Sequence, residues 1–229
     1  MNDSDVYLEW APPPAWQSVV ACCWEQRVIA GRVQRVLPDG CADLLVDESG
    51  GIEVVGVSDT VALPVLPSGS WTRGIRLRPE AVGRTLGAVA STLRNTTVPL
   101  GDVVGSRRAR ALAGHHAIDA WIRGVEPDAR TRAAVRLLAG HHVEGVAERI
   151  GLSSRQLHRL FMAEVGINPK TFQRVARLRR FLAFSEAGYG LAAAAAGAGY
   201  ADQPHLTREV HRLAGLTPVA LLAERGVTG

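Results

Sequence analysis

The sequence predicts an α+β protein in which a small β-barrel or sandwich precedes an all-α half. The chain has 229 residues, which exceeds one typical domain of ~100–150 residues and favours two small ones. Its first half holds short apolar runs separated by turns, whereas the chain after about Pro127 shows only helical patterning. The charge changes too. Residues 1–105 carry 8 Arg against 12 Asp and Glu, whereas residues 106–229 carry 18 Lys and Arg against 10 Asp and Glu.

Strands are expected in the first half where apolar runs lie between turn signals such as Pro38-Asp39-Gly40 and Pro67-Ser68-Gly69. Residues 71–77 alternate apolar and polar positions, as a half-buried strand does. Residues 80–93 and 106–123 are expected to be helical and to lead into the second half. The expected strands cover residues 19–24, 34–37, 42–46, 52–57 and 71–77.

Composition excludes several classes of protein. The apolar runs, such as Leu191 to Ala196, are far shorter than the ~20 residues that a membrane-spanning helix needs. The first residues are acidic and do not resemble a signal peptide, so a cytoplasmic location is expected. Three cysteines are too few for a disulfide scaffold or a four-cysteine zinc site. The net charge of +8 on residues 106–229 indicates an anionic partner.

The basic half contains an internal repeat with a period of 49 residues. Each copy consists of a short helix, a glycine-bearing turn and a second helix that begins at a capping residue, Ser153 in the first copy and Asp202 in the second. The shift places Ala147 on Ala196, Leu157 on Leu206, Arg159 on Arg208, Gly166 on Gly215, and Pro169 on Pro218.

The second helix of each copy has a buried stripe and a cationic outward face. In the first copy Leu157, Leu160 and Phe161 form the stripe. This is the layout of a helix-turn-helix unit, whose second helix can lie in the major groove of DNA and read base edges. A helix from Pro169 to about Glu186 would join the copies as a strut of ~25 Å. That span is close to the ~34 Å between successive major-groove segments on one side of DNA.

These motifs carry a resemblance to a known family. Residues 152–177, with Leu152-Ser-Ser-Arg-Gln-Leu-His-Arg-Leu-Phe161, and residues 199–218, with Gly199-Tyr-Ala-Asp-Gln-Pro-His-Leu-Thr-Arg208, resemble the two halves of the AraC/XylS-type DNA-binding domain. The resemblance covers about residues 127–229. It implies a seven-helix domain with two helix-turn-helix units that binds promoter DNA, with RNA polymerase as a candidate partner. The residues that it implies face DNA are Ser154, Arg155, His158, Arg159, Gln203, Pro204, His205 and Arg208.

In the first half, a second set of motifs consists of Trp24, Leu37-Pro-Asp-Gly-Cys-Ala-Asp-Leu44, Val55-Gly56 and Gly74-Ile-Arg-Leu-Arg-Pro79. With these motifs, residues 6 to about 105 resemble an uncharacterised sensor domain that precedes such regulators, which implies a cupin-like β-barrel. We expect residues 1–105 to bind an effector or mediate dimerisation, residues 106–126 to form a helical linker, and residues 127–229 to bind DNA. An effector pocket needs apolar walls with a few convergent polar groups. The candidate residues for it are Trp24, Asp39, Cys41, Asp43 and Trp71. The alternative assigns the tryptophans to the core and Pro38-Asp39-Gly40 to a simple turn.

Two other readings stay open. Some DNA-repair proteins join a reactive cysteine to the same kind of DNA-binding domain, and Cys22, Cys23 or Cys41 could accept an alkyl group. The other reading is an effector-independent dimer of DNA-binding subunits. The neighbouring pairs His115-His116 and His141-His142 do not favour a metal site, because adjacent helix positions point ~100° apart. We therefore predict a transcriptional regulator without cofactor, metal or enzymatic activity, binding DNA as a monomer or homodimer and not associating with membranes.

Overall fold

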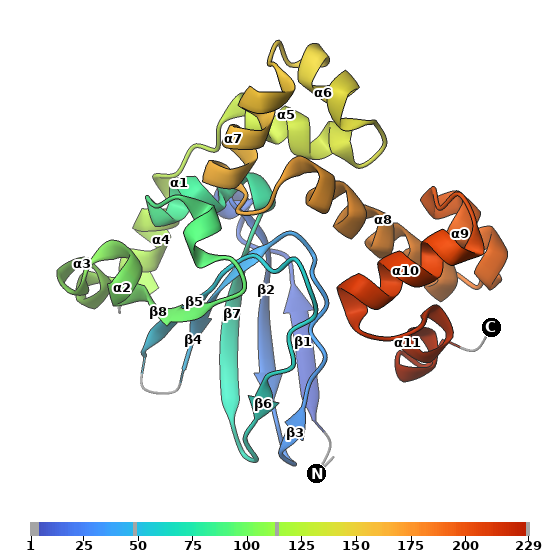
Figure 1. Cartoon of the computed structure of the whole chain (residues 1–229). Coiled ribbons are helices and arrows are strands. Elements are labelled where there is room, and N and C mark those ends of the chain that lie inside the picture. The colour runs from blue at the N-terminus through green and yellow to red at the C-terminus, as the bar shows by residue number, and fades with distance from the viewer. Residues whose placement is uncertain (1–4, 48–49, 113–114, 228–229) are drawn as a thin grey trace.

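The computed structural model describes residues 5–47, 50–112 and 115–227, with the side chains of His115 and His116 outside the described part. The α+β class is confirmed: a β-rich first half is followed by a helical second half (Figure 1). Every strand pair is antiparallel, in a six-stranded sheet of order β1-β2-β7-β4-β5-β8 and a two-stranded sheet of β3 and β6. The strands are β1 (Val6–Trp10), β2 (Val20–Arg27), β3 (Arg32–Val33), β4 (Ala42–Val46), β5 (Ile52–Val55), β6 (Val65–Leu66), β7 (Trp71–Leu77) and β8 (Thr97–Pro99).

Four of the five expected strands are present. β4 and β7 have the predicted bounds, and β2 and β5 lie within a few residues of theirs. Residues 34–37 are not a strand and contribute only an isolated bridge between Val36 and Ala62. The expectation was wrong there because apolar content alone does not supply a partner strand, and strand propensity depends on such neighbours. The edge strand β1 was not expected from the sequence.

The segment after β7 is helical but broken. Pro79 fixes the start of one short turn, and Gly87, with φ +63°, ends the next helix in a left-handed conformation. The elements are η1 (Pro14–Trp16), η2 (Pro79–Ala81), α1 (Val82–Leu86), η3 (Ala90–Leu93), α2 (Leu100–Val104), α3 (Ser106–Ala111) and α4 (His115–Arg123). The expected helical character of residues 80–93 is met by three short elements, and that of residues 106–123 by α3 and α4 in the described residues on either side of 113–114.

Seven helices follow in the described part of the second half, as the resemblance implies. Asp128 caps the first of them by accepting a hydrogen bond from the backbone N–H of Thr131 at 2.8 Å. The helices are α5 (Ala129–Leu138), α6 (Val143–Arg149), α7 (Ser154–Glu164), α8 (Pro169–Glu186), α9 (Leu191–Ala198), α10 (Gln203–Ala214) and α11 (Pro218–Glu224). No helix among the described residues is long and apolar enough to cross a membrane.

The two halves share one hydrophobic core. Buried side chains run without interruption from the sheet, for example Leu44 and Leu77, into the helical half at Phe161 and Phe181. The start of η3 approaches the turn after α7 so closely that a Cβ on Gly166 would lie 3.2 Å from the carbonyl oxygen of Ala90. The helical half is therefore packed directly against the β-rich half.

Candidate nucleic-acid interface

The first helix-turn-helix unit consists of α6, a turn at Gly151 (φ +68°) and α7. Ser153 and Gln156 form the expected capping box at the start of α7. The Gln156 backbone N–H donates to Oγ of Ser153 at 3.2 Å, and Oε1 of Gln156 accepts from the Ser153 backbone N–H at 2.8 Å. The cap fixes where α7 begins and hence which side chains occupy its first two turns.

α7 presents one buried and one exposed face. Leu157 and Phe161 are fully buried, which confirms the predicted stripe, while Leu160 is half-buried. Within the described residues, neither the Arg155 nor the Arg159 side chain has a hydrogen-bond or ion-pair partner. The four predicted contact residues of this helix are all exposed: Ser154, Arg155, His158 and Arg159.

The second unit repeats this layout with α9, a left-handed turn at Gly199 (φ +90°) and α10. Asp202 caps α10 by accepting from the His205 backbone N–H at 2.6 Å. Leu206, Val210 and Leu213 are buried, as the sequence predicts. Of the four predicted contact residues here, Gln203, Pro204 and Arg208 are exposed.

His205, the remaining predicted contact residue, is engaged within the protein. Its Nδ1 accepts from the Ala201 backbone N–H at 3.2 Å. Its Nε2 lies 3.4 Å from Nη1 of Arg177 and 3.6 Å from Oε1 of Glu209, and its ring stands edge-on to Tyr200. Both ring nitrogens therefore have intramolecular partners. The sequence carries a signal for this, because Glu209 follows His205 by four residues on one helix face.

α8 joins the two units, which lie at its opposite ends (Figure 1). Its 18 residues correspond to about 27 Å at 1.5 Å per residue. Several arginines of α8 hold the second unit in place. Glu209 of α10 pairs with Arg174 at 3.3 Å and Arg177 at 2.9 Å, and Arg180 donates to the backbone oxygen of Ala198 at 2.9 Å.

The small side chains of α9 have a packing reason. A Cβ on Gly197 would lie 3.0 Å from the ring of Phe184 on α8, and Ala194 and Ala198 are fully buried. Larger side chains would push α9 away from α8. The alanine-rich sequence thus lets the second unit sit close to the strut.

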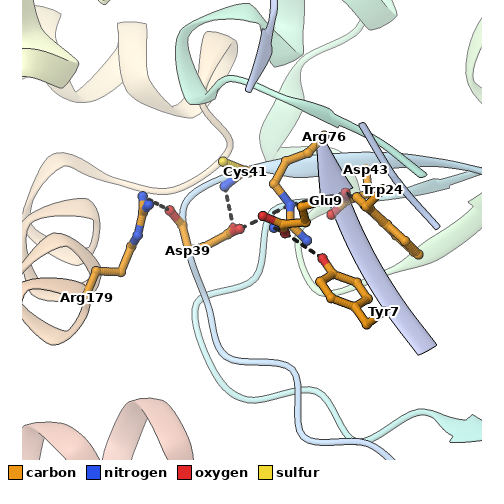
Figure 2. Close-up of polar contacts among 8 residues, drawn as sticks. All are labelled: Tyr7, Glu9, Trp24, Asp39, Cys41, Asp43, Arg76 and Arg179. Atoms are coloured by element: carbon orange, nitrogen blue, oxygen red, sulfur yellow. Dashed lines mark hydrogen bonds and ion pairs between the residues drawn. The ribbon is translucent and has the colours of Figure 1, made fainter. Parts of the chain in front are cut away.

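Four of the five candidate effector residues gather in one polar cluster of the first half (Figure 2). Nε1 of Trp24 donates to Oδ1 of Asp43 at 2.8 Å, and the Cys41 backbone N–H donates to Oδ1 of Asp39 at 2.8 Å. The fifth, Trp71, lies apart under the guanidinium of Arg73, at 4.4 Å.

The centre of the cluster is Arg76, which sequence reasoning missed. Its guanidinium lies 3.3 Å from Asp43, 3.4 Å from Asp39 and 3.1 Å from Glu9 (Figure 2). Burial acts to lower the pKa of Arg76, but the carboxylates of Asp43 and Asp39 outweigh it and raise that pKa. Burial raises the pKa of Asp43, with Arg76 and the Trp24 indole N–H opposing the shift. Three carboxylates lie around one guanidinium and more than balance its charge, so this cluster has the character of an internal ion network.

The thiols near this cluster are poorly suited to ionise. Burial raises the pKa of Cys22 to about 11. Burial, with the charges of Asp39 and Asp43, holds the pKa of Cys41 well above its ordinary value. Burial also raises the pKa of Cys23. Among the described residues, no group of three or more His, Cys, Asp or Glu side chains is placed to hold a metal ion.

Two units of this kind, mounted on one strut with exposed arginines on their second helices, define a DNA-binding helix-turn-helix domain. Residues 146–224 match the family model described as a helix-turn-helix domain, and residues 8–99 match one described as a domain of unknown function, DUF6597. Residues 146–224 are therefore an AraC-type helix-turn-helix domain, which confirms the resemblance over that range. This domain supports a DNA-binding transcriptional regulator.

Solved structures with overall similarity are those of ToxT from Vibrio cholerae. The structure from strain O395 shares 10% identity, covers 99% of both chains and has a TM-score of 0.48. The structure of ToxT from strain SCE256 with a bound unsaturated fatty acid shares 10% identity over 96% of this chain and 95% of that one, with a TM-score of 0.44. No curated protein matches the chain.

Proposed function

We propose that the chain is a sequence-specific regulator whose helices α7 and α10 enter two successive major-groove segments of one DNA duplex. The observation that carries this is the exposure of equivalent arginines, Arg159 and Arg208, at the same place in two copies of one unit. The strut of about 27 Å supports it, because it is of the order of one helical repeat of DNA. Affinity comes mainly from phosphate contacts, and specificity from base edges.

The experiment that tests this is recovery of bound genomic fragments, followed by affinity measurements on the recovered sites. We expect a bipartite site with two half-sites about one helical turn apart. Loss of one half-site should cost affinity without abolishing binding. A single short site, or equal affinity for all sequences, contradicts the two-helix arrangement.

We further propose that the chain consists of a sensor domain (1–105), a helical linker (106–126) and a DNA-binding domain (127–229). An effector would act by changing how the first and last of these domains dock on each other. The support is a set of contacts between the first half and the end of the second unit. Arg35 donates to the backbone oxygen of Ala214 at 2.7 Å and pairs with Glu224 at 2.9 Å, and Thr60 Oγ1 donates to the backbone oxygen of Arg212 at 3.3 Å. A ligand that changes this docking would move α10 and change DNA affinity. Contact with RNA polymerase belongs to the same proposal.

The effector-independent dimer is favoured by one observation, the edge strand β1. All five of its residues are exposed, among them Tyr7, Leu8 and Trp10 at 45, 56 and 46%. The opposite edge of the sheet is poorly suited to pairing with another strand, because β8 is three residues long and ends at Pro99. Antiparallel pairing of β1 with a second copy, with Leu8 at the twofold axis, would extend the sheet and cover these side chains. Light scattering tests it: Leu8→Lys should convert a dimer to a monomer, and a wild-type monomer contradicts it.

A further inference from the structure

Between the two halves lies a cleft of about 460 Å³, whose lining includes no residue of α7 or α10. It is walled by the start of η2 from the first half and by α5 and α8 from the second. Four arginines line it: Arg78, Arg132, Arg136 and Arg179. Its volume is in the range of small-molecule pockets, roughly 300–1,000 Å³.

The cleft carries an excess of positive charge. Its one carboxylate is that of the buried Glu80, against four guanidinium groups. Arg132 and Arg136 are four residues apart on α5 and so share a face. Within the described residues, the Arg136 side chain has no hydrogen-bond or ion-pair partner.

The other three guanidinium groups are held in place by hydrogen bonds or ion pairs, and each keeps N–H donors that these contacts do not occupy. Arg78 donates through Nε to the backbone oxygen of Gln17 at 2.7 Å, and Arg179 donates to that of Asp39 at 3.3 Å. Arg132 reaches Glu126 at 3.3 Å. Since a guanidinium has five N–H donors, each of these groups keeps donors for a further acceptor. Positioned guanidinium groups of this kind recognise carboxylate or phosphate.

The remaining wall is apolar. Phe172, Val135, Ala139 and Ala176 contribute side chains, and Phe172 is held edge-on against Phe161. A free inorganic ion would leave this wall in contact with water. The lining therefore suits a ligand with an anionic group at one end and a small apolar body at the other.

We propose that this cleft binds a small organic anion, a carboxylate or phosphate monoester with an apolar body, and that the ligand bridges the two halves. Arg78 belongs to the first half, whereas Arg132, Arg136 and Arg179 belong to the DNA-binding domain. Arg179 also contacts Asp39, which pairs with Arg76 (Figure 2). The ligand thus stabilises the docked arrangement of the halves. The regulatory effect of this ligand rests on the proposed function, whereas its binding to the cleft is independent of that function.

The test is calorimetric titration of the full chain with phenyl phosphate, with benzoate and inorganic phosphate as companions and benzyl alcohol as the neutral comparison. We expect one phenyl phosphate per chain, weaker binding of inorganic phosphate, and no binding of benzyl alcohol. Arg136→Gln should weaken phenyl phosphate binding at least tenfold, which is about 1.4 kcal/mol. Since Arg136 is exposed and has no described partner, the variant should keep the melting temperature of the wild type.

The matched control is Arg130→Gln, an exposed arginine of the same helix that does not line the cleft. It should leave the affinity within about twofold, because it removes the same charge from outside the site. Equal affinities of the two variants overturn the proposal, and so does an absence of binding by both anionic aromatic probes. If Arg136→Gln instead lowers the salt dependence of DNA binding while phenyl phosphate does not bind, the cleft arginines serve DNA, and the proposal fails.

The two proposals fail separately. A chain that binds no DNA but shows the expected phenyl phosphate titrations retains the ligand site and loses the proposed function. A chain that binds its operator but not the probes retains the proposed function and loses the ligand site. Where both hold, saturating phenyl phosphate should change operator affinity in the wild type and not in Arg136→Gln.

Discussion

A Cβ on Gly40 would lie 2.8 Å from Cε2 of Phe172, so the Pro38-Asp39-Gly40 turn of the first half rests directly on strut α8. Gly40 also has φ +84°, a left-handed conformation that other residues rarely adopt. Phe172 is only 6% exposed and packs against Phe161, so it cannot easily move aside. The turn is therefore a docking point between the halves.

We predict that Gly40→Ala destabilises the protein by about 2–5 kcal/mol, from left-handed strain of ~1–2 kcal/mol and overpacking of ~1–3 kcal/mol. Urea unfolding followed by tryptophan fluorescence measures this. Gly69→Ala is the matched control, with φ +76° and no atom within 4 Å of the added Cβ, so it should show only the strain. Equal losses in the two variants would mean that the turn does not press on Phe172.

The second prediction concerns Glu209, which pairs with Arg174 and Arg177 and keeps a side-chain exposure of only 15%. Glu209→Ala should cost about 1–3 kcal/mol, because it leaves partly buried donors without an acceptor. The loss of stability should be concentrated in the second helix-turn-helix unit. Amide hydrogen exchange should therefore accelerate in α10 more than in α7. Glu148→Ala on the exposed side of α6 is the control, with a change within about 0.5 kcal/mol. Uniform acceleration across both units would contradict the anchoring role.

The helical half could be largely predicted because its signals are local. Caps such as Ser153 and Asp202, and buried positions such as Leu157 and Leu206, follow from spacing within one helix. The sensor half depends on strand register, which is not local. Trp24 pairs with Gly74, whose missing side chain makes room for the indole, since a Cβ there would lie 1.9 Å from Cε2 of Trp24.

The same register separates the two tryptophans that sequence reasoning placed in one pocket. Trp71 is three residues from Gly74 along β7 and so lies on the opposite face of the sheet from Trp24. Arg76 is two residues from Gly74 and shares the Trp24 face, where it meets Asp43. No short-range pattern encodes this pairing. The cleft between η2, α5 and α8 could not be predicted from the sequence either, because its arginines come from segments that are far apart in the chain.

The third prediction addresses DNA recognition. Arg155→Ala and Arg208→Ala should each weaken operator binding by ~1–3 kcal/mol and relax preference at separate half-sites. Fluorescence anisotropy on the operator and on single-base variants measures both effects. Arg107→Ala, an exposed arginine of α3, is the control and should leave affinity nearly unchanged. Equal losses on all DNA sequences would assign the two arginines to phosphate contacts, with the salt dependence falling by about one unit each.

The fourth prediction tests the cysteine-dependent alternative through the raised pKa values of the thiols. The thiolate is the reactive form, and burial keeps Cys22, Cys23 and Cys41 protonated near pH 8. Native protein should therefore resist iodoacetamide at pH 8 over a time in which urea-unfolded protein gains three adducts, as mass spectrometry would show. Unfolding frees the thiols to ionise near their ordinary pKa of 9.0, so the free energy of unfolding should fall as pH rises from about 9 towards 11. Cys22→Ala should lessen that decline, and the remainder should come from Cys23, Cys41 and the tyrosines Tyr7 and Tyr200, whose pKa values burial also raises. Rapid alkylation of one cysteine in the native state would instead indicate a reactive thiol and would favour the hypothesis of a cysteine-dependent DNA-repair protein.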